Sequence, residues 1–314
     1  MRLRSIVLAT AGVLVVAASA TAALTGATAL PAGNLVKNPG GEVPLGGGNG
    51  VVNVAPVAWL KEDVKGSDGR VQAGVQVVRY VKHEANGILG TARSASIGGG
   101  RNYFSGGYPA SISTAYQVLD VSGAAAEIDG GGVKACLSAY LGGSAFSPAT
   151  ARVDLQFLGE DESSLGQLRI GPVTRGQRQD QYALLRRASE KSVPASTRTL
   201  RVSFTAESST GAGWEGYADN ISVALVKGGS CDPVLVVKCV KKALVATVNP
   251  SAVAPTQRVR FAVRGGKTKQ AVDGRAPHTA KFTMDGLKGK LTVTADVSQK
   301  GGGTITLVKK STRC

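Results

Sequence analysis

Three consecutive carboxylates, Glu160, Asp161 and Glu162, are the residues of this chain that come closest to acid–base chemistry. Two carboxyl groups about 5–10 Å apart are the machinery of glycoside hydrolysis. The three residues, however, follow an apolar segment that ends at Leu158 and precede Leu165, a position typical of a solvated hairpin turn. We therefore expect no catalytic residue in this cluster, and a glycoside-acting enzyme is the remote alternative for the function.

The two histidines, His83 and His278, offer no second catalytic arrangement. Neither predicts a Ser-His-Asp or Cys-His set. No pair of cysteines has the spacing of a zinc site, and no glycine-rich segment has the form of a phosphate-binding loop. The sequence thus predicts a protein that is not an enzyme.

Aromatic side chains point to a different chemistry, because a sugar ring binds on an aromatic platform beside polar groups in a groove. Tyr103 and Tyr108 lie in one polar segment, and Trp214 lies in a glycine-rich loop before an alternating apolar run. We expect Trp214, Tyr108 and Tyr103 to contact a ligand. Trp59 and Phe104 are expected to pack in the core instead.

Short runs of alternating apolar and polar residues must position these side chains, since no long stretch has the apolar period of a helix. Glycine is frequent, at 42 of 314 residues, and it clusters with Pro, Asp and Ser between the runs. The pattern predicts an all-β chain built of sandwiches, with strands at 75–80, 133–141, 151–158, 199–205, 258–263 and 290–297.

Two segments bound the first folded region. It opens with Asn34-Leu-Val-Lys-Asn-Pro-Gly-Gly-Glu42 and closes with Gly216-Tyr-Ala-Asp-Asn-Ile-Ser-Val-Ala-Leu225. Together they resemble the first and last strands of secreted galactose-binding-like jelly rolls, a class that includes carbohydrate-binding modules. The resemblance implies a jelly roll over residues 33–228 that binds a carbohydrate or the cell envelope.

The same resemblance implies a metal site. In that class, one acidic residue from the first strand and one from the last commonly hold a structural Ca²⁺ together with backbone carbonyls. Glu42 and Asp219 occupy these positions, and Ca²⁺ takes roughly six to eight oxygen ligands. The alternative is that Asp219 caps a turn and Glu42 makes only a surface hydrogen bond.

Basic residues are concentrated in the last part of the chain, whose net charge is +16 as a whole. Residues 229–314 carry 16 Lys and Arg against four Asp, whereas residues 33–228 carry 19 basic and 17 acidic side chains. The step coincides with the Gly/Ser stretch Lys227-Gly-Gly-Ser-Cys231, which is suited to a linker. We therefore place a domain boundary between residues 228 and 229.

The basic region contains Arg258-Val-Arg-Phe-Ala-Val263 followed by Asp273-Gly-Arg-Ala-Pro277. This pattern resembles a bacterial Ig-like module, which implies a smaller sandwich over 229–314 that attaches or spaces. Its charge favours an anionic cell-envelope polymer or an acidic polysaccharide as partner. Nucleic acid is not expected, because the region has no Tyr or Trp on which bases could stack.

Three of the four cysteines, Cys231, Cys239 and Cys314, lie in the basic region, and Cys136 lies in the first. A Cys231–Cys314 disulfide would join the two ends of the second domain and is the pairing we expect. Cys239–Cys314 is the second choice. Cys136 is expected to be a buried free thiol.

The first 22 residues have the pattern of an export signal: Arg2 and Arg4, an apolar run from Ile6 to Ala18, and small residues around 18–22. Cleavage after either Ala20 or Ala22 fits, and a retained N-terminal anchor is the alternative. The sequence thus predicts a secreted or cell-surface, non-enzymatic protein without a transmembrane segment once cleaved. The competing hypothesis is a structural or adhesive extracellular protein that has no sugar site.

Overall fold

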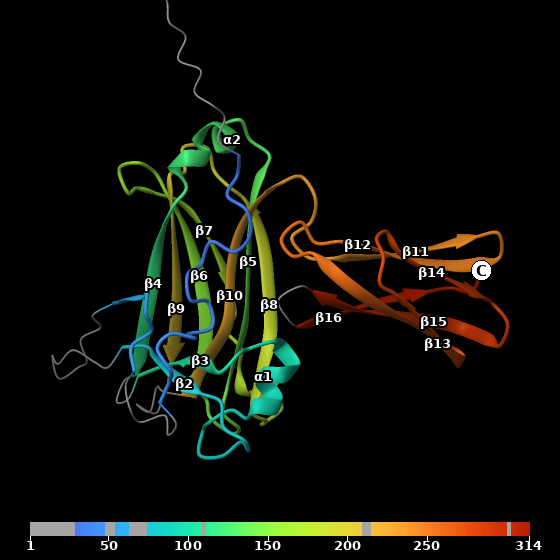
Figure 1. Cartoon of the computed structure of the whole chain (residues 1–314), viewed down its shortest axis with the longest axis horizontal. Helices are drawn as coiled ribbons and strands as arrows, with labels where there is room; N and C mark the ends of the chain where they lie inside the picture. Colours follow the sequence, from blue (N-terminus) through green and yellow to red (C-terminus); the bar gives the residue numbers. More distant parts are fainter. Residues whose placement is uncertain (1–28, 48–53, 63–73, 108–110, 209–214, 300–302) are drawn as a thin grey trace, which may run out of the picture.

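The computed structural model describes residues 29–47, 54–62, 74–107, 111–208, 215–299 and 303–314. The expected leader at 1–22 lies outside these residues. The regular secondary structure of the described residues is almost all antiparallel strand, which confirms the predicted all-β class. Figure 1 shows a tall sandwich made of β1 to β10, and a smaller one, made of β11 to β16, that projects from its side.

Two five-stranded sheets form the first sandwich. The β9 sheet has the order β1 (Leu60–Lys61), β4 (Ile112–Asp120), β9 (Thr199–Glu207), β6 (Thr150–Leu158) and β7 (Ser164–Ile170). The β10 sheet has the order β2 (Gln76–Arg79), β3 (Asn102–Ser105), β10 (Gly216–Lys227), β5 (Val133–Gly143) and β8 (Ala183–Ser192). The four strands that the sequence predicts in this region correspond to β2, β5, β6 and β9 and are confirmed.

The core of the first sandwich lies between these sheets, where alternate residues of each strand point inward. Phe157 and Phe204 enter it from the β9 sheet and Phe104 from the β10 sheet, all with 0% of their surface exposed. The Phe104 ring centre lies 6.0 Å from that of Phe204 and 5.1 Å from that of Trp59. The predicted core positions of Trp59 and Phe104 are therefore confirmed.

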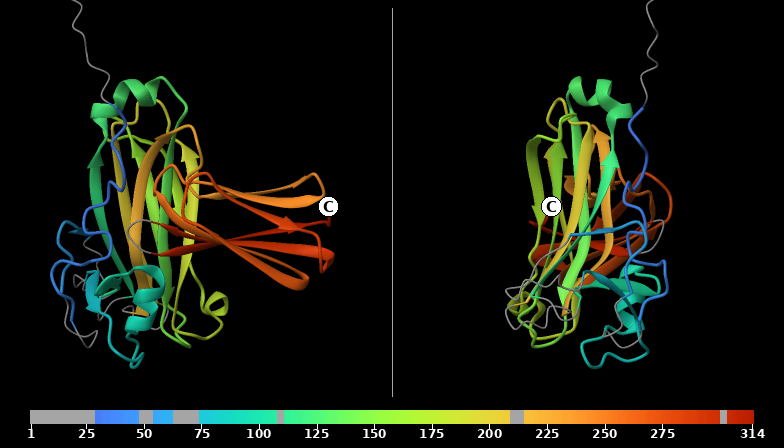
Figure 2. Two further views of the ribbon diagram at one scale, coloured as in Figure 1. Left: turned by 45° about the vertical axis from the view of Figure 1, so that its right-hand side comes forward. Right: turned by 90° about the vertical axis from the view of Figure 1, so that its left-hand side faces the viewer.

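A second, smaller apolar cluster covers part of the outer face of the β10 sheet. The chain between β2 and β3 carries helix α1 (Thr91–Ile97) and folds back over this face. Beneath it, the ring of Tyr103 lies 4.9 Å from that of Tyr80 and 5.0 Å from that of Tyr217. Figure 2 shows α1 beside the lower end of the tall sandwich. The remaining short helices are η1 (Ser122–Ala124), α2 (Ala125–Asp129) and α3 (Arg175–Arg178).

The segment 34–42, predicted as the first strand, has no regular strand geometry. It nevertheless runs along β10, because the backbone N–H of Leu35 donates to the carbonyl of Val223 and that of Ile221 donates to Pro39. The Asn34 amide group adds two bonds to β10. The expected proximity of the two bounding segments is thus confirmed, whereas the strand itself is not.

Arg178, at the end of α3, is the most deeply buried cation among the described residues, with 3% of its surface exposed. Its guanidinium donates hydrogen bonds of 2.6–3.3 Å to four backbone carbonyls, those of Ser144, Ser147, Ala149 and Val173. A charged fork thereby joins the β5–β6 connection to the segment after β7.

The second sandwich contains two three-stranded sheets. The β12 sheet consists of β11 (Val234–Val240), β12 (Ala243–Asn249) and β14 (His278–Thr283), and the β15 sheet of β13 (Thr256–Asp273), β15 (Leu287–Gln299) and β16 (Thr304–Ser311). Phe261 and Phe282 pack between them. The predicted strands 258–263 and 290–297 are confirmed; the likeness to Ig-like modules stays a prediction. No helix in the described parts of either sandwich is long and apolar enough to cross a bilayer.

The disulfides differ from those expected. Cys136 pairs with Cys231, and Cys239 pairs with Cys314, so the predicted Cys231–Cys314 pairing and the free thiol at Cys136 are wrong. The second choice, Cys239–Cys314, is the observed one. Cys136 points outward from β5, and its disulfide joins the two sandwiches covalently. Disulfides of this kind persist in oxidising compartments.

Candidate functional site

A polar strip on the outer face of the β10 sheet is the starting point for the site. Leu137 and Leu141 of β5 enter the core, so the alternation of the strand turns Ser138 and Tyr140 outward. The strand register then sets Tyr140 beside Arg186 of β8, and Ser138 beside Ser222 of β10. Three strands thus present a hydroxyl-rich surface without a large apolar side chain.

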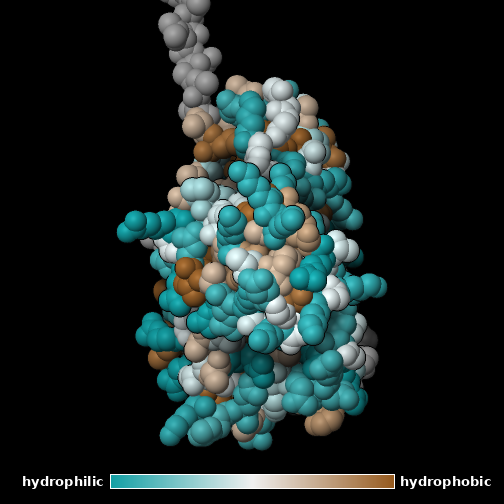
Figure 3. All heavy atoms as spheres, turned by 90° about the vertical axis from the view of Figure 1, so that its right-hand side faces the viewer, coloured by the Kyte–Doolittle hydropathy of each residue, from teal (hydrophilic) through white to brown (hydrophobic). Residues whose placement is uncertain are grey.

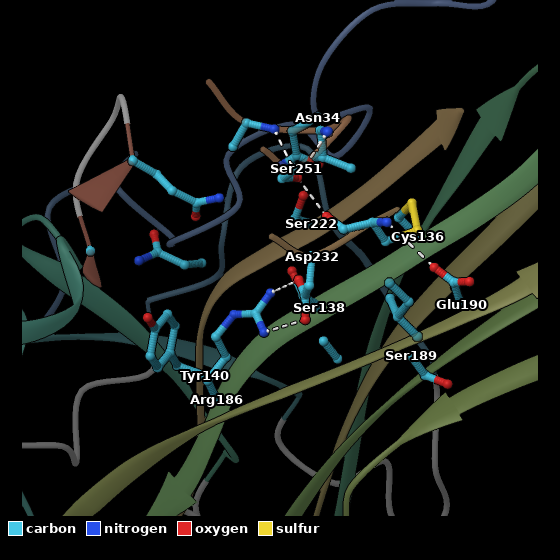
Figure 4. A pocket seen from close by; sticks show the side chains of 18 of the residues that line it. Asn34, Cys136, Ser138, Tyr140, Arg186, Ser189, Glu190, Ser222, Asp232 and Ser251 are labelled. Atoms are coloured by element: carbon cyan, nitrogen blue, oxygen red, sulfur yellow. Dashed lines mark hydrogen bonds and ion pairs between the residues drawn. A yellow bond between two sulfur atoms is a disulfide. The ribbon is translucent and has the colours of Figure 1, made fainter. Parts of the chain in front are cut away.

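The second sandwich converts this strip into a groove, which we call the interdomain groove. It has a volume of about 530 Å³ and is lined by residues of both sandwiches. Residues 230–232, 251, 253, 254, 299 and 303 form the opposite wall. Figure 4 shows Tyr140, Arg186 and Ser138 on one side of this space and Ser251 on the other.

Three contacts between the sandwiches fix the width of the groove. The Arg186 guanidinium forms a bidentate ion pair with the Asp232 carboxylate, with Nη1 2.9 Å from Oδ2. The Cys136–Cys231 disulfide lies beside this pair, and the backbone N–H of Cys231 donates to Oε2 of Glu190 at 3.4 Å. The ion pair is partly exposed and contributes about 1 kcal/mol or less by itself, so the covalent bond is the stronger constraint.

Tyr140 is the one aromatic residue among the described groove-lining residues. Burial raises the pKa of its hydroxyl, an effect that the nearby Arg186 charge opposes. The phenol is therefore neutral at physiological pH and can both donate and accept a hydrogen bond. Together with Ser138, Ser222 and Asn220, it gives the groove several groups that hydrogen-bond in both senses.

The two carboxylates among the described groove-lining residues are already paired with cations. Asp232 faces Arg186, and Oε1 of Glu190 accepts a hydrogen bond of 2.8 Å from Nζ of Lys134. That hydrogen bond lowers the pKa of Glu190. A glycosidase needs a carboxyl group whose pKa is raised so that it can donate a proton, and Glu190 is shifted in the opposite direction.

Glu42 and Asp219 lie close together beside Asn220, which lines the groove. Oδ1 of Asp219 lies 2.8 Å, Oε1 of Glu42 3.6 Å and Oδ1 of Asn220 3.8 Å from the point where a side chain on Gly40 would place its Cβ. The structure therefore brings the two predicted metal ligands together, with an amide oxygen beside them.

Asp219 is fully buried, with 0% of its surface exposed. Its carboxylate accepts hydrogen bonds from the Tyr80 hydroxyl at 2.6 Å and from the backbone N–H of Asn220 at 2.6 Å. Burial raises the pKa of Asp219 well above its usual value, and the Glu42 charge raises it further, against the lowering effect of the two hydrogen bonds. Glu42 has a cationic partner in Arg101, whose Nε lies 4.0 Å from Oε2, whereas Asp219 has none among the described residues, so a proton or a cation would stabilise it.

The donor set fits a hard cation such as Ca²⁺ in charge and in ligand type, because all three converging groups offer oxygen. Glu42 also accepts hydrogen bonds of 3.0–3.1 Å from the backbone N–H groups of Arg101 and Asn102. In the described part of the chain, no three His, Cys, Asp or Glu side chains gather at one point. A bound ion would therefore rely on this carboxylate pair and on neutral oxygens.

Of the three predicted sugar-contacting aromatics, the structure describes only Tyr103. Tyr103 is 1% exposed, packed beneath the chain that carries α1, and its hydroxyl accepts from the backbone N–H of Leu89. The prediction that it offers an exposed platform is wrong. Tyr108 and Trp214 lie outside the described residues. The carboxylate cluster is solvent-exposed, and its residues Glu160 and Asp161 form the turn between β6 and β7, as expected.

Sequence reasoning missed Tyr140 and Arg186. A signal for Tyr140 existed, because Ala139-Tyr-Leu141 places one tyrosine between two apolar residues of a strand. No such signal existed for Arg186, whose role depends on Asp232 in the other sandwich.

No protein-family model matches the sequence, and no curated protein matches it. Among solved structures, the chain is similar to the enzymatically active domain of tailspike protein 4 of bacteriophage CBA120, with 13% identity over 62% of this chain and a TM-score of 0.37. It is also similar to the CBM22-1 and GH10 modules of a Clostridium thermocellum endo-1,4-beta-D-xylanase complexed with xylohexaose, with 16% identity over 57% of this chain and a TM-score of 0.32. The chain spans only 21% and 27% of these two proteins.

A third similar structure is the N-terminal CBM22-1-CBM22-2 tandem domain from Paenibacillus barcinonensis Xyn10C. There the identity is 11%, the coverage 92% of both chains and the TM-score 0.36. Likenesses at this level carry no conclusion about ligand or activity, so the functional argument depends on the residues of this chain.

Proposed function

We propose that this protein is a secreted, non-enzymatic carbohydrate-binding protein and that its jelly roll binds a polar saccharide in the interdomain groove. The observation that carries the proposal is the groove itself. Its volume of about 530 Å³ falls in the usual range of ligand sites, roughly 300–1,000 Å³. Its lining combines the Tyr140 ring with hydroxyl, amide and guanidinium groups, which match the dense alternation of donors and acceptors on a sugar.

The absence of catalysis is part of the proposal. Its support is that Glu190 and Asp232, the two carboxylates that line the groove among the described residues, are held by Lys134 and Arg186. Secretion is supported by the export signal in the sequence and by the two disulfides.

We also propose that Ca²⁺ binds at Glu42 and Asp219 as a structural ion. Its role would be to neutralise two neighbouring carboxylates where the segment 34–42 meets β10. Because Asn220 contributes both to this cluster and to the groove lining, the ion would hold this part of the groove lining in place. The ion takes no part in any reaction.

The test is binding of the full mature chain to an array of neutral and acidic glycans and to insoluble cell-wall material. Tyr140→Ala removes the ring from the groove, and we expect at least a tenfold loss of affinity for any neutral glycan that the wild type retains. Phe146→Ala is the matched control, because Phe146 is 65% exposed and does not line the groove.

Two outcomes would overturn the proposal. One is that no glycan binds the wild type, in which case the structural or adhesive hypothesis stands. The other is that Tyr140→Ala and Phe146→Ala behave alike. Release of reducing sugar from a bound polysaccharide would refute the non-enzymatic part alone.

A further inference from the structure

The outer face of the β15 sheet carries a second set of side chains that the groove does not use. Alternation along β13 buries Val259, Phe261 and Val263, so Arg258, Arg260 and Arg264 point outward together. We call this surface the arginine face. Figure 3 views the molecule from the side on which the second sandwich projects, and hydrophilic residues predominate there.

The strand register places hydroxyl groups beside these arginines. Arg258 of β13 lies opposite Ser298 of β15, which in turn lies opposite Thr304 of β16. In the same way, Arg260 lies opposite Asp296, which lies opposite Thr306. Arg258, Arg260, Asp296, Ser298 and Thr304 line one shallow depression of about 400 Å³. The cations on β13 thus lie beside side chains on β15 and β16 that can form hydrogen bonds with hydroxyl groups.

The cations of this face lack partners among the described residues. In the part of the chain that the structure describes, no ion pair within 4.0 Å involves Arg258, Arg260 or Arg264. Asp296, although opposite Arg260, instead accepts a hydrogen bond of 2.8 Å from the Thr306 hydroxyl. Guanidinium forks are pre-organised to bind carboxylates in a bidentate manner, so this surface is complementary to an anion that comes from outside.

We propose that the arginine face binds a polysaccharide that carries carboxylates, with Arg258 and Arg260 on the carboxylates and Asp296, Ser298 and Thr304 on the sugar hydroxyls. Alternate residues of a strand are about 6.6–6.8 Å apart, so the two arginines can engage neighbouring acidic groups on one polymer. Asp296 favours a polysaccharide over a polyphosphate as the ligand. Its carboxylate can accept hydrogen bonds from the hydroxyl groups of a sugar, whereas a polyphosphate has no such hydroxyl groups and is only repelled by the negative charge. The site is separate from the interdomain groove and does not depend on it.

The experiment uses the full mature chain and measures its affinity for polygalacturonate, for a neutral galactan and for inorganic polyphosphate at 0.1 M salt. The double variant R258Q/R260Q should lose at least tenfold in affinity for polygalacturonate. The control is K238Q/K281Q, which removes the same charge from the same sandwich. Lys238 and Lys281 are exposed on the other sheet, where both lie in register with Val245. We expect at most a twofold loss for this control.

A third variant separates the glycan from other anions. D296A removes a negative charge together with a hydroxyl acceptor, so polyphosphate binding should strengthen while polygalacturonate binding weakens. Unchanged melting temperatures would show that the variants are folded. Tyr140→Ala should leave polygalacturonate affinity unaltered, which distinguishes failure of this site from failure of the groove.

Three results would overturn the proposal. Equal losses in the two double variants would mean that net charge alone attracts the polymer. A D296A variant that binds both polymers more tightly would remove the contact with sugar hydroxyls. Equal affinity of the wild type for galactan and polygalacturonate would remove the carboxylates from recognition.

Discussion

The carboxylate pair beside Asn220 leads to a prediction that combines stability, pH and metal binding. Above the raised pKa of Asp219, Glu42 and Asp219 carry two negative charges near one point, and no cationic side chain neutralises the buried Asp219 within the described residues. We expect Ca²⁺ to raise the melting temperature of the wild-type protein. The isosteric variant Asp219→Asn keeps an oxygen for the Tyr80 hydroxyl but removes the charge, so it should not respond.

The size of the shift in melting temperature can be estimated from the charge repulsion that the ion relieves and from the ion concentration relative to its dissociation constant. Two unit charges about 6 Å apart repel by about 3 kcal/mol at an effective dielectric constant of about 20. A ligand present at 100 times its dissociation constant stabilises the native state by about 2.7 kcal/mol. For a domain of roughly 150–250 residues, each kcal/mol corresponds to about 2–4 °C. A saturating concentration of Ca²⁺ should therefore raise the melting temperature by about 5–10 °C.

The pH dependence has a definite sign. Burial raises the pKa of Asp219 in the folded state above the unfolded value of about 3.9. A raised folded-state pKa gives stability that is fully present below the unfolded pKa and is lost as pH rises through the folded pKa. Without Ca²⁺, stability should fall over that window in the wild type and not in Asp219→Asn. Because Ca²⁺ competes with the proton, its stabilising effect should vanish towards pH 4.

Differential scanning calorimetry of the mature chain, with Ca²⁺ and with a chelator, between pH 4 and pH 8, tests this reasoning. Asp161→Asn is the control, because Asp161 is an exposed turn carboxylate far from the pair in sequence, and its variant should respond as the wild type does. A wild-type curve that is indifferent to Ca²⁺ and chelator at pH 8 would refute the cation. A Ca²⁺ response that persists in Asp219→Asn would show that the ion binds elsewhere.

Two further predictions concern stability and domain organisation. Arg178→Met should lower the free energy of unfolding, measured by urea denaturation, by at least about 3 kcal/mol. The reason is that four buried carbonyls lose charge-assisted hydrogen bonds, each worth about 1.5–3 kcal/mol. A loss below about 1 kcal/mol would mean that water replaces the guanidinium. Limited proteolysis should cut near Gly229 and yield two β-rich fragments that remain joined by Cys136–Cys231 until a reductant is added; the Cys136→Ala variant should release them without reductant, and a chain that resists cleavage at this point would contradict the boundary.

The strands could be predicted because apolar and polar residues alternate along each of them, and this alternation shows which face of the strand is buried. In β6, for example, Val153, Leu155 and Phe157 enter the core, and the polar residues between them do not. The sequence could not show that Asn34 to Glu42 would follow β10 without strand geometry. There, side-chain bonds from Asn34 take the place of a regular ladder.

The site was harder to predict, because it depends on what lies over a sheet face. Alternation correctly separates Tyr103 from Phe104, which points into the core. The outer face at Tyr103, however, is covered by the chain that carries α1, and Tyr140 on the same face stays partly open. Cys136 and Cys231 were assigned to separate domains, so their pairing became visible only when the two sandwiches were placed together.

The two disulfides also determine how this protein would carry tension. A pull at Cys314 passes through its bond to Cys239, along the short stretch of β11 back to Cys231, and through the second bond into Cys136. The chain between Cys239 and Cys314, which are 75 positions apart in the sequence, is bypassed, so the second sandwich would not unfold under load. The force enters β5, which is hydrogen-bonded on both sides, by β10 and by β8. The two disulfides and the backbone between Cys231 and Cys239 thus form a continuous covalent path from Cys314 into the sheet that carries the groove.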